Sequence, residues 1–246
     1  VFAPQPFEDA MALRILGFDA DDTLWHNETI FQLSHQRFAD LLGAHAAPDH
    51  LVERLEATER RNLKLYGYGI KGFTLSMIET ALAVGDAALP PSVVAELLAI
   101  GRDMLEHPVE PLPGVVETLE GLRSAGHRLV LITKGDLLDQ EQKIARSGLA
   151  EAFDAIEIVS EKSAATYARI FGRFGAGEGE AVMVGNSAAS DILPALQAGY
   201  WGLHIPYHVT WTHELAEVPD DAPRFRRLAR IEDVPEAIAG IAGAAS

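Results

Sequence analysis

Three carboxylates stand within four residues of one another, directly after a short apolar run. Asp19, Asp21 and Asp22 follow Leu13–Phe18 and precede Thr23. Carboxylates that crowd beside a buried strand repel one another, and a cation relieves that repulsion. Asp19 and Asp21 would face the same side of an extended segment, so that one can attack a substrate while the other transfers protons. The alternative is an acidic turn in which Asp22 or Thr23 caps the next helix.

A candidate phosphate-binding turn follows a second apolar run, Arg128–Thr133. Thr133, Lys134 and Gly135 offer a hydroxyl, a flexible backbone and N–H groups where a strand passes into a helix. Such a turn can hold a phosphoryl group. It can equally be an ordinary loop in which the threonine caps the helix, and these residues alone leave both interpretations open.

Two later strand ends carry a cation and further oxygen ligands. Lys162 follows the run Ala155–Val159 and could neutralise a carboxylate and a phosphate together; the alternative is a solvated lysine in the first turn of a helix. Asn186 and Asp191 follow the run Ala181–Val184. An amide oxygen and a carboxylate are ligands for a hard cation, although Asp191 also suits the first turn of the next helix.

The bulk composition narrows the classes of metal and partner. The chain has 246 residues and no cysteine, which excludes thiolate metal sites and favours hard ions such as Mg²⁺ on carboxylates. Its formal net charge of −16 argues against binding to nucleic acid or an anionic membrane. An anionic substrate would need a metal and local lysines to reverse the field in its pocket. No apolar run approaches the roughly 20 residues that span a bilayer, and Val1–Glu8 does not resemble a signal peptide, so we expect a cytoplasmic protein.

The apolar runs predict a parallel sheet. The five predicted strands are Leu13–Phe18, Arg128–Thr133, Ala155–Val159, Ala181–Val184 and Gly202–Ile205. Helical spacing separates the last four, and the predicted helices are Leu137–Ser147, Ser163–Phe174 and Asp191–Ala198, with a closing helix at Glu232–Ile241. This alternation is typical of strand–helix–strand units. Ligands of such sheets bind at the carboxyl ends of the strands, where the polar residues above are found.

The first two predicted strands are separated by about 110 residues that show only helical spacing. The predicted helices there are Glu28–Leu42, His50–Leu65, Phe73–Val84 and Pro91–Leu105. A loop of this length is improbable in a compact domain. Residues 27–107 are therefore interpreted as an all-α cap domain inserted into a core of residues 1–26 and 108–246. The predicted fold class is α/β, with a doubly wound, Rossmann-like parallel sheet.

The order of these motifs resembles the haloacid dehalogenase superfamily. Its members carry an Asp-x-Asp motif followed by Thr after the first strand, then a Thr or Ser, a Lys, and an acidic motif after the fourth strand. Here the matching residues are Asp19-Ala20-Asp21-Asp22-Thr23, then Thr133, Lys162, and Gly185-Asn186-Ser187 with Asp191. The helical insertion after the first motif resembles the family's cap, and the resemblance covers roughly residues 13–210.

The resemblance implies a Mg²⁺-dependent phosphatase that acts on a small phosphorylated metabolite. It makes Asp19 a nucleophile that forms an aspartyl-phosphate, and Asp21 an acid and base; Thr133 and Lys162 complete the implied catalytic set. The implied substrate-binding residues are Thr133, Lys134, Gly135, Lys162 and, in the cap, Lys71. The implied metal ligands are Asp19, Asp21 through its backbone carbonyl, Asn186 and Asp191.

One departure from the family pattern supports a catalytically inactive rival, and two other rivals follow from the superfamily itself. The family usually has Asp where this chain has Asn186, which lowers the charge of the ligands by one, and Asp191 could contribute instead. A 2-haloacid dehalogenase is similar in cap and fold, but lacks an acid at the position of Asp21 and uses no metal. A catalytically inactive binding protein is the second rival, and a phosphomutase would keep both acids. Monomer and homodimer are both compatible with the sequence.

Three further features have two interpretations each. The glycine-rich segment Lys64–Phe73 is either a specificity loop or a flexible turn between cap helices. Trp25 either lines the mouth of the site or packs under the hinge. A Zn²⁺ site is conceivable near the end of the chain, but its two histidines do not have the helical pair spacing, and a loop at the pocket rim is favoured. The residues concerned are His208, His213 and Glu214.

Overall fold

A computed structural model of the chain describes residue 13 and residues 15–85, 89–209 and 216–244. Val1–Glu8, His213 and Glu214 lie outside the described residues. The strands form one parallel sheet in the order β3-β2-β1-β4-β5-β6. Their bounds are β1 Ile15–Phe18, β2 Arg128–Lys134, β3 Ala155–Val159, β4 Ala181–Gly185, β5 Trp201–His204 and β6 Phe225–Arg227. This is the strand order of doubly wound nucleotide-binding folds, and the predicted fold class is confirmed.

Alternating residues of the central strands face two helical layers. Leu16 and Phe18 of β1 pack in one core cluster with α5 (Val115–Ser124), α6 (Leu137–Ser147) and α9 (Val234–Ala244). Ile15 packs in the other, with α7 (Ala164–Arg173) and α8 (Leu193–Gln197). The strand runs contain apolar residues at nearly every position because the sheet is covered on both faces.

Three details of the core differ from the sequence prediction. Strand β6 was not predicted, because only Phe225 of its three residues is buried and the other two are exposed arginines. Helix α5 was not predicted either. The predicted helix Asp191–Ala198 is divided into a π-helical turn, Ala188–Ile192, and α8. Pro194 has no N–H to donate to the carbonyl of Ser190, which instead accepts a 3.0 Å hydrogen bond from the Tyr167 hydroxyl.

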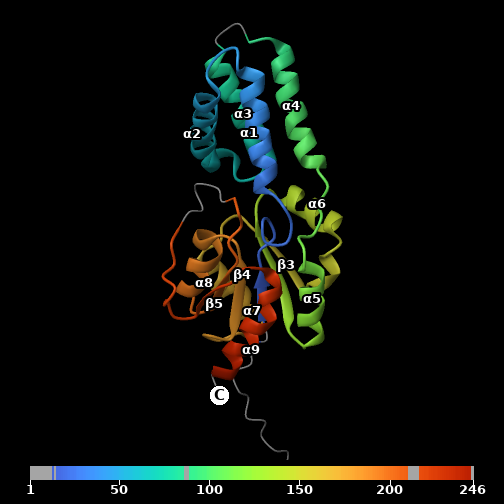
Figure 1. Cartoon of the computed structure of the whole chain (residues 1–246), viewed down its shortest axis with the longest axis vertical. Coiled ribbons are helices and arrows are strands. Elements are labelled where there is room, and N and C mark those ends of the chain that lie inside the picture. The colour runs from blue at the N-terminus through green and yellow to red at the C-terminus, as the bar shows by residue number, and fades with distance from the viewer. Residues whose placement is uncertain (1–12, 14, 86–88, 210–215, 245–246) are drawn as a thin grey trace, which may run out of the picture.

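Four helices stand on the carboxyl-end side of the sheet and pack around a core of their own (Figure 1). They are α1 (Glu28–Leu42), α2 (Pro48–Tyr66), α3 (Ile70–Val84) and α4 (Pro91–Glu106), where the sequence predicted helices. The fully buried side chains of this core include Phe38, Leu51, Leu55, Met77 and Leu97. We call these helices and their connections the cap; its boundaries as a separate domain, 27 and 107, stay a prediction.

The two chain segments that connect cap and core lie side by side. Trp25 forms an isolated antiparallel bridge with Pro111, and the N–H of Leu112 donates to the carbonyl of Leu24 at 2.8 Å. Trp25 is 1% exposed and packs in the core under this crossing, which agrees with the hinge interpretation. In the described part of the chain, no helix combines the length and apolar character needed to cross a bilayer.

Candidate active site

The strand register brings the predicted catalytic residues to one edge of the sheet. Phe18 at the end of β1 pairs with Leu131 of β2 on one side and Val184 of β4 on the other. Asp19 directly follows β1, and Thr133 lies two residues beyond Leu131, near the end of β2. These residues are 6% and 1% exposed and lie at the bottom of a cavity between core and cap.

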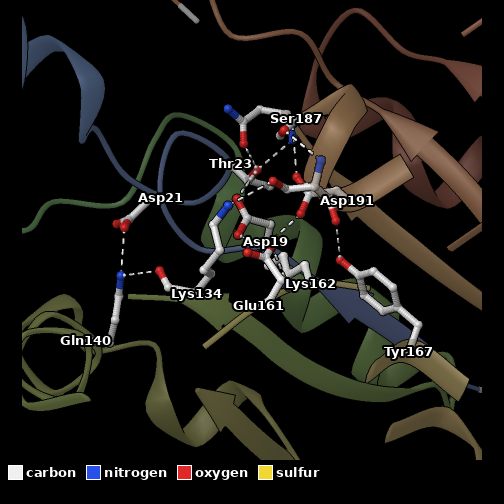
Figure 2. Close-up of polar contacts among 12 residues, drawn as sticks. Asp19, Asp21, Thr23, Lys134, Gln140, Glu161, Lys162, Tyr167, Ser187 and Asp191 are labelled. Atoms are coloured by element: carbon white, nitrogen blue, oxygen red, sulfur yellow. Dashed lines mark hydrogen bonds and ion pairs between the residues drawn. The ribbon is translucent and has the colours of Figure 1, made fainter. Parts of the chain in front are cut away.

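A buried lysine bridges two carboxylates (Figure 2). The ammonium of Lys162 contacts Asp19 Oδ1 and lies 2.7 Å from Asp191 Oδ1, and Asp191 is fully buried. The backbone N–H of Ser187 donates to the other oxygen of Asp191 at 2.9 Å. A Cβ at position 185 would lie 2.3 Å from Asp191 Oδ2, so Gly185 provides the space for this carboxylate. Asp191 is thus a partner of Lys162, and its predicted role as a metal ligand stays a prediction.

One ammonium does not fully compensate two buried carboxylates. Burial disfavours the charged form of Lys162, yet the charges of Asp19 and Asp191 outweigh burial and hold its pKa well above the ordinary value. Burial, followed by the charge of Asp191, raises the pKa of Asp19 to about 7 despite the opposing effect of Lys162. A second cation near Asp19 would therefore be stabilised electrostatically.

Three oxygens without protons gather beside Asp19. The Asn186 side-chain oxygen position lies 3.1 Å from Asp19 Oδ2 and 3.2 Å from the backbone carbonyl of Asp21. The hydroxyl of Thr23 donates within the same group, at 3.1 Å from both Asp19 Oδ2 and Asn186 Oδ1. Neighbouring oxygens around an octahedral Mg²⁺ are about 3 Å apart, since Mg–O distances are about 2.0–2.1 Å. With the Asn186 amide turned over, its nitrogen would instead donate to these oxygens.

The predicted phosphate-binding turn offers one hydroxyl that is not engaged. Thr133 Oγ1 is buried and has no hydrogen-bond partner among the described residues. A buried hydroxyl without a partner is unfavourable unless a ligand supplies one. Lys134 beside it donates to Ser190 Oγ at 3.0 Å and lies 4.3 Å from the centre of the Tyr68 ring. Both residues and Gly135 line the cavity.

The carboxylate of Asp21 lies apart from this group (Figure 2). Trp25 Nε1 donates to it at 2.7 Å, Gln140 Nε2 at 2.8 Å, and Lys143 Nζ lies 2.9 Å from both of its oxygens. Burial favours the neutral acid, but the charge of Lys143 and these hydrogen bonds outweigh it, and the pKa of Asp21 is lowered. The third carboxylate, Asp22, accepts from the first N–H groups of the cap at 2.8–3.0 Å and so has the capping role considered above.

The family of the chain follows from its match to a family model. Residues 13–199 match the model of haloacid dehalogenase-like hydrolases, which is more than half of the chain. The chain belongs to this hydrolase family. The resemblance seen in the motifs is thereby confirmed, and the residues that carry it meet at one edge of the sheet, as described above.

The similar proteins include phosphatases. A glyceraldehyde 3-phosphate phosphatase of Methanopyrus kandleri is 26% identical over 194 residues, which cover 76% of this chain and 81% of that one. The phosphatase of the same name from Methanothermobacter thermautotrophicus is 34% identical over 96 residues, which cover 37% of this chain and only 42% of that one. Among solved structures, a haloacid dehalogenase-like family hydrolase from Xanthomonas campestris has 40% identity and a TM-score of 0.84, covering 95% and 94% of the two chains.

The cap contributes the other wall of the cavity in this member of the hydrolase family. The cavity measures about 150 Å³ and is lined on the cap side by α1, α2 and α3. His35 Nε2 lies 2.9 Å from Glu59 Oε1, and both side chains are nearly buried, 13% and 10% exposed. Burial disfavours a charged imidazole, but the hydrogen bond and charge of Glu59 outweigh burial, and the pKa of His35 is raised. The Phe73 ring lies 5.1 Å from the imidazole in an edge-to-face arrangement, and Phe31 packs in the same way against Phe73.

The predicted cap residue Lys71 is placed beside the site. Its ammonium lies 2.7 Å from Asp136 Oδ1 and is half exposed, and Lys71 is not one of the residues that line the cavity. Asp136 also caps α6, accepting from the N–H of Asp139 at 3.0 Å. The turn before Lys71 touches the same aspartate, because a Cβ at Gly69 would lie 3.2 Å from the Asp136 Cβ. A substrate contact by Lys71 stays a prediction.

Sequence reasoning missed the polar residues that helices bring to the cavity. On α6, Gln140 and Lys143 share the buried face with Ile144 and Ser147, at positions where an amphipathic helix has apolar residues. On the cap helices, His35, Glu59 and Asn62 interrupt apolar stripes in the same way. Polar residues at helix positions where an apolar residue is expected were the signal in the sequence that could have identified these side chains. The described residues contain no cluster of three or more His, Asp or Glu side chains suited to a metal, and the Zn²⁺ hypothesis also involved two undescribed residues.

Proposed function

We propose that this hydrolase is a Mg²⁺-dependent phosphomonoesterase that acts on a small phosphorylated metabolite through an aspartyl-phosphate intermediate. One observation carries the proposal. At the floor of a single cavity, the Asp19 carboxylate and the Lys162 ammonium lie with a buried Thr133 hydroxyl that lacks a partner among the described residues. Nucleophile, charge compensation and a phosphoryl-oxygen donor are the parts that phosphoryl transfer requires.

The metal would be held by Asp19 Oδ2, the backbone carbonyl of Asp21 and the Asn186 amide oxygen, the three oxygens that gather at 3.1–3.2 Å. When bound, Mg²⁺ supplies a positive charge that offsets the charge of the transferring phosphoryl group. The described side chains near it are consistent with this assignment, because one lysine leaves a buried negative charge uncompensated.

The proposed reaction has two halves. An oxygen of Asp19 attacks phosphorus, the bond between phosphorus and the ester oxygen breaks, and Asp21 gives that oxygen a proton. Water then attacks phosphorus, Asp21 takes a proton from it, and the bond to Asp19 breaks to release inorganic phosphate. The lowered pKa of Asp21 keeps its carboxylate unprotonated, which is the form that takes a proton from water in the second half, whereas the first half requires Asp21 in its protonated form. Thr133 and Lys162 would hold the phosphoryl oxygens throughout.

Asp21 also bears on the rival functions. A halide leaves without a proton, so a 2-haloacid dehalogenase has no use for an acid on the cavity wall, whereas an alkoxide requires one. Asp21 lines the cavity and is held by three donors. A catalytically inactive binding protein would gain nothing from a carboxylate maintained in this way.

The size of the cavity and the names of the relatives point to a short phosphorylated compound. A cavity of about 150 Å³ suits a molecule of few atoms. Both curated relatives are glyceraldehyde 3-phosphate phosphatases, and we infer a triose-like phosphate or a compound of similar size as substrate. The cytoplasmic location and the choice between monomer and homodimer stay predictions.

The test is a screen of small phosphorylated metabolites and 4-nitrophenyl phosphate with the purified full chain, with and without Mg²⁺. We expect phosphate release that depends on Mg²⁺, stops with a chelator and is abolished by Asp19→Asn. Release of halide from 2-haloacids without metal would instead establish the dehalogenase. No turnover of any of these compounds would favour the inactive binding protein.

A further inference from the structure

Lys143 on α6 makes an unusual set of contacts beside the catalytic turn. Its ammonium lies 2.9 Å from both carboxylate oxygens of Asp21 and 2.9 Å from Asn27 Oδ1, and 3.8 Å from Asp139 Oδ2. The side chain is only 10% exposed. A lysine held this way has lost most of its hydration, so its contacts have to replace water. Lys143 is therefore held in place by the residues of the site and in turn holds them.

The surroundings of Asp21 leave its carboxylate little freedom. Gln140 Nε2 donates to Asp21 Oδ2 at 2.8 Å and to the carbonyl of Lys134 at 3.2 Å. A Cβ at Gly135 would lie 2.7 Å from Gln140 Nε2, so the absence of a side chain at Gly135 lets the glutamine reach this position. Trp25 Nε1 fixes the other oxygen at 2.7 Å. Lys143 is the only charged donor among the three.

The position of Asp21 suits a leaving group more than the transferring phosphoryl group. Asp19 and Lys162 form the floor of the cavity, whereas Asp21 and Gln140 lie to one side, apart from the floor (Figure 2). Lys143 also lines the cavity and contacts Asp21. The ester oxygen of a substrate whose phosphorus lies over Asp19 would point away from the floor, into the space that Asp21 borders.

Lys143 also contacts the entry to the cap. Asn27 directly precedes α1, and its side chain makes no capping hydrogen bond to that helix. The N–H groups at this end of α1 are bonded by Asp22 instead. The Asn27 side chain is thus available to Lys143, which joins the catalytic turn to the first cap residues. A displacement of the cap entry would act on Asp21 through this ammonium.

We propose that Lys143 is a positioning residue that fixes the Asp21 carboxylate next to the leaving-group oxygen and ties its position to the cap through Asn27. The proposal rests on the function proposed above, in which Asp21 gives the leaving group its proton. Lys143 itself does not touch the reacting atoms.

The test compares two leaving groups in Lys143→Met. 4-Nitrophenolate is a stable anion that leaves without a proton, whereas the alkoxide of glycerol 3-phosphate requires one. Positioned proton transfer contributes about 10²–10⁴-fold to a rate. We expect kcat/KM for glycerol 3-phosphate to fall roughly 10- to 100-fold more than kcat/KM for 4-nitrophenyl phosphate. The ratio of the two, measured on one sample, does not depend on the fraction of folded enzyme.

Three further variants complete the design. Lys143→Arg keeps the charge and should recover part of the ratio. Asn27→Ala removes the cap contact and should shift the ratio in the same direction by a smaller factor. Arg54→Met removes an exposed cation of α2 outside the segment Lys64–Phe73 and should leave the ratio at the wild-type value.

The outcomes separate this inference from the function on which it rests. Equal losses on both substrates in Lys143→Met would overturn the positioning role, and a wild-type ratio in Asn27→Ala would overturn the link to the cap. A wild-type enzyme that hydrolyses neither substrate with Mg²⁺, nor any other phosphate ester, would overturn the proposed function itself.

Discussion

The core wall and the cap wall of the cavity use charge in different ways. On the core wall, Lys162 contacts both Asp19 and Asp191, and all three residues are almost completely buried. On the cap wall, His35 and Glu59 form one pair with the Phe73 ring against the imidazole, and Asn62 lies on the next turn of α2. On the core wall one lysine faces two carboxylates, whereas on the cap wall one histidine faces one carboxylate, whose hydrogen bond and charge raise the pKa of that histidine.

This difference indicates that the core wall carries out the chemistry and that the cap wall binds the rest of the substrate. Strand ends bring a few consecutive residues to one point, so the chemical groups are fixed by the turns of the core. The cap helices present side chains one turn apart, and each can be replaced without moving those turns. We therefore expect substitutions in the core wall to reduce turnover or stability strongly, and substitutions in the cap wall to have smaller effects, mainly on substrate binding.

Among the substitutions that test this division between the two walls, Asp21→Asn should have the largest effect, which is on turnover. The amide keeps the size of the side chain and leaves the backbone carbonyl of residue 21 in place, but it cannot transfer a proton. We expect kcat to fall about 10²–10⁴-fold while Mg²⁺ affinity stays nearly unchanged. Steady-state kinetics and a Mg²⁺ titration check this, with Asp103→Asn on the exposed side of α4 as control. Unchanged turnover would remove Asp21 from its role.

Lys162→Met should give the next largest effect, on stability. It leaves Asp19 and Asp191 buried without their shared cation, and removing one partner of a buried ion pair destabilises by about 3–5 kcal/mol. Because Mg²⁺ would compensate part of this charge, the loss should be smaller in its presence. Urea unfolding with and without Mg²⁺ measures both. A loss below about 1 kcal/mol would mean that the two carboxylates are neutralised in another way.

The same contrast explains what the sequence could predict. Asp19, Thr133, Lys162 and Asn186 were predicted as a group because each lies at the end of a strand or shortly after it, and the parallel register brings strand ends together. Gln140, Lys143, His35 and Glu59 were not, because their role depends on which face of a helix meets the cavity and on the position of the cap over the sheet. Strand β6 lacked a signal since its arginines are exposed.

A third prediction concerns the metal ligands of the core wall. Asn186→Asp replaces a neutral oxygen with a charged one next to Asp19 Oδ2 and the carbonyl of Asp21. Ligand charge tunes cation affinity, and we expect Mg²⁺ to bind on the order of tenfold more tightly. Without Mg²⁺ the variant should be less stable than wild type, because a further carboxylate joins an uncompensated group. Calorimetric titration with Mg²⁺ measures the affinity of both proteins. Equal affinities in the variant and the wild type would mean that residue 186 is not a ligand of the metal.

Of these substitutions, Glu59→Gln in the cap wall should have the smallest effect, which is a pH-dependent loss of stability. The pKa of His35 is raised above its unfolded value of about 6.5. The protonated imidazole therefore contributes stability that is complete below about pH 6.5 and is lost as the pH rises through the folded-state pKa. Without the charge of Glu59 this contribution should shrink, so Glu59→Gln should be less stable than wild type by on the order of 1–2 kcal/mol at pH 5.5–6 and by less at pH 8.5.

Urea unfolding of both proteins from pH 5.5 to 8.5 measures this difference, and Glu53→Gln, an exposed position of the same helix, is the matched control. A stability difference that is independent of pH would show that the pair with His35 is not the origin of the effect. In the same variant, KM should change more than kcat, because under the proposed function the cap wall would face the leaving group and not the phosphorus. A loss of kcat as large as that of Asp21→Asn would contradict the division of tasks between the two walls.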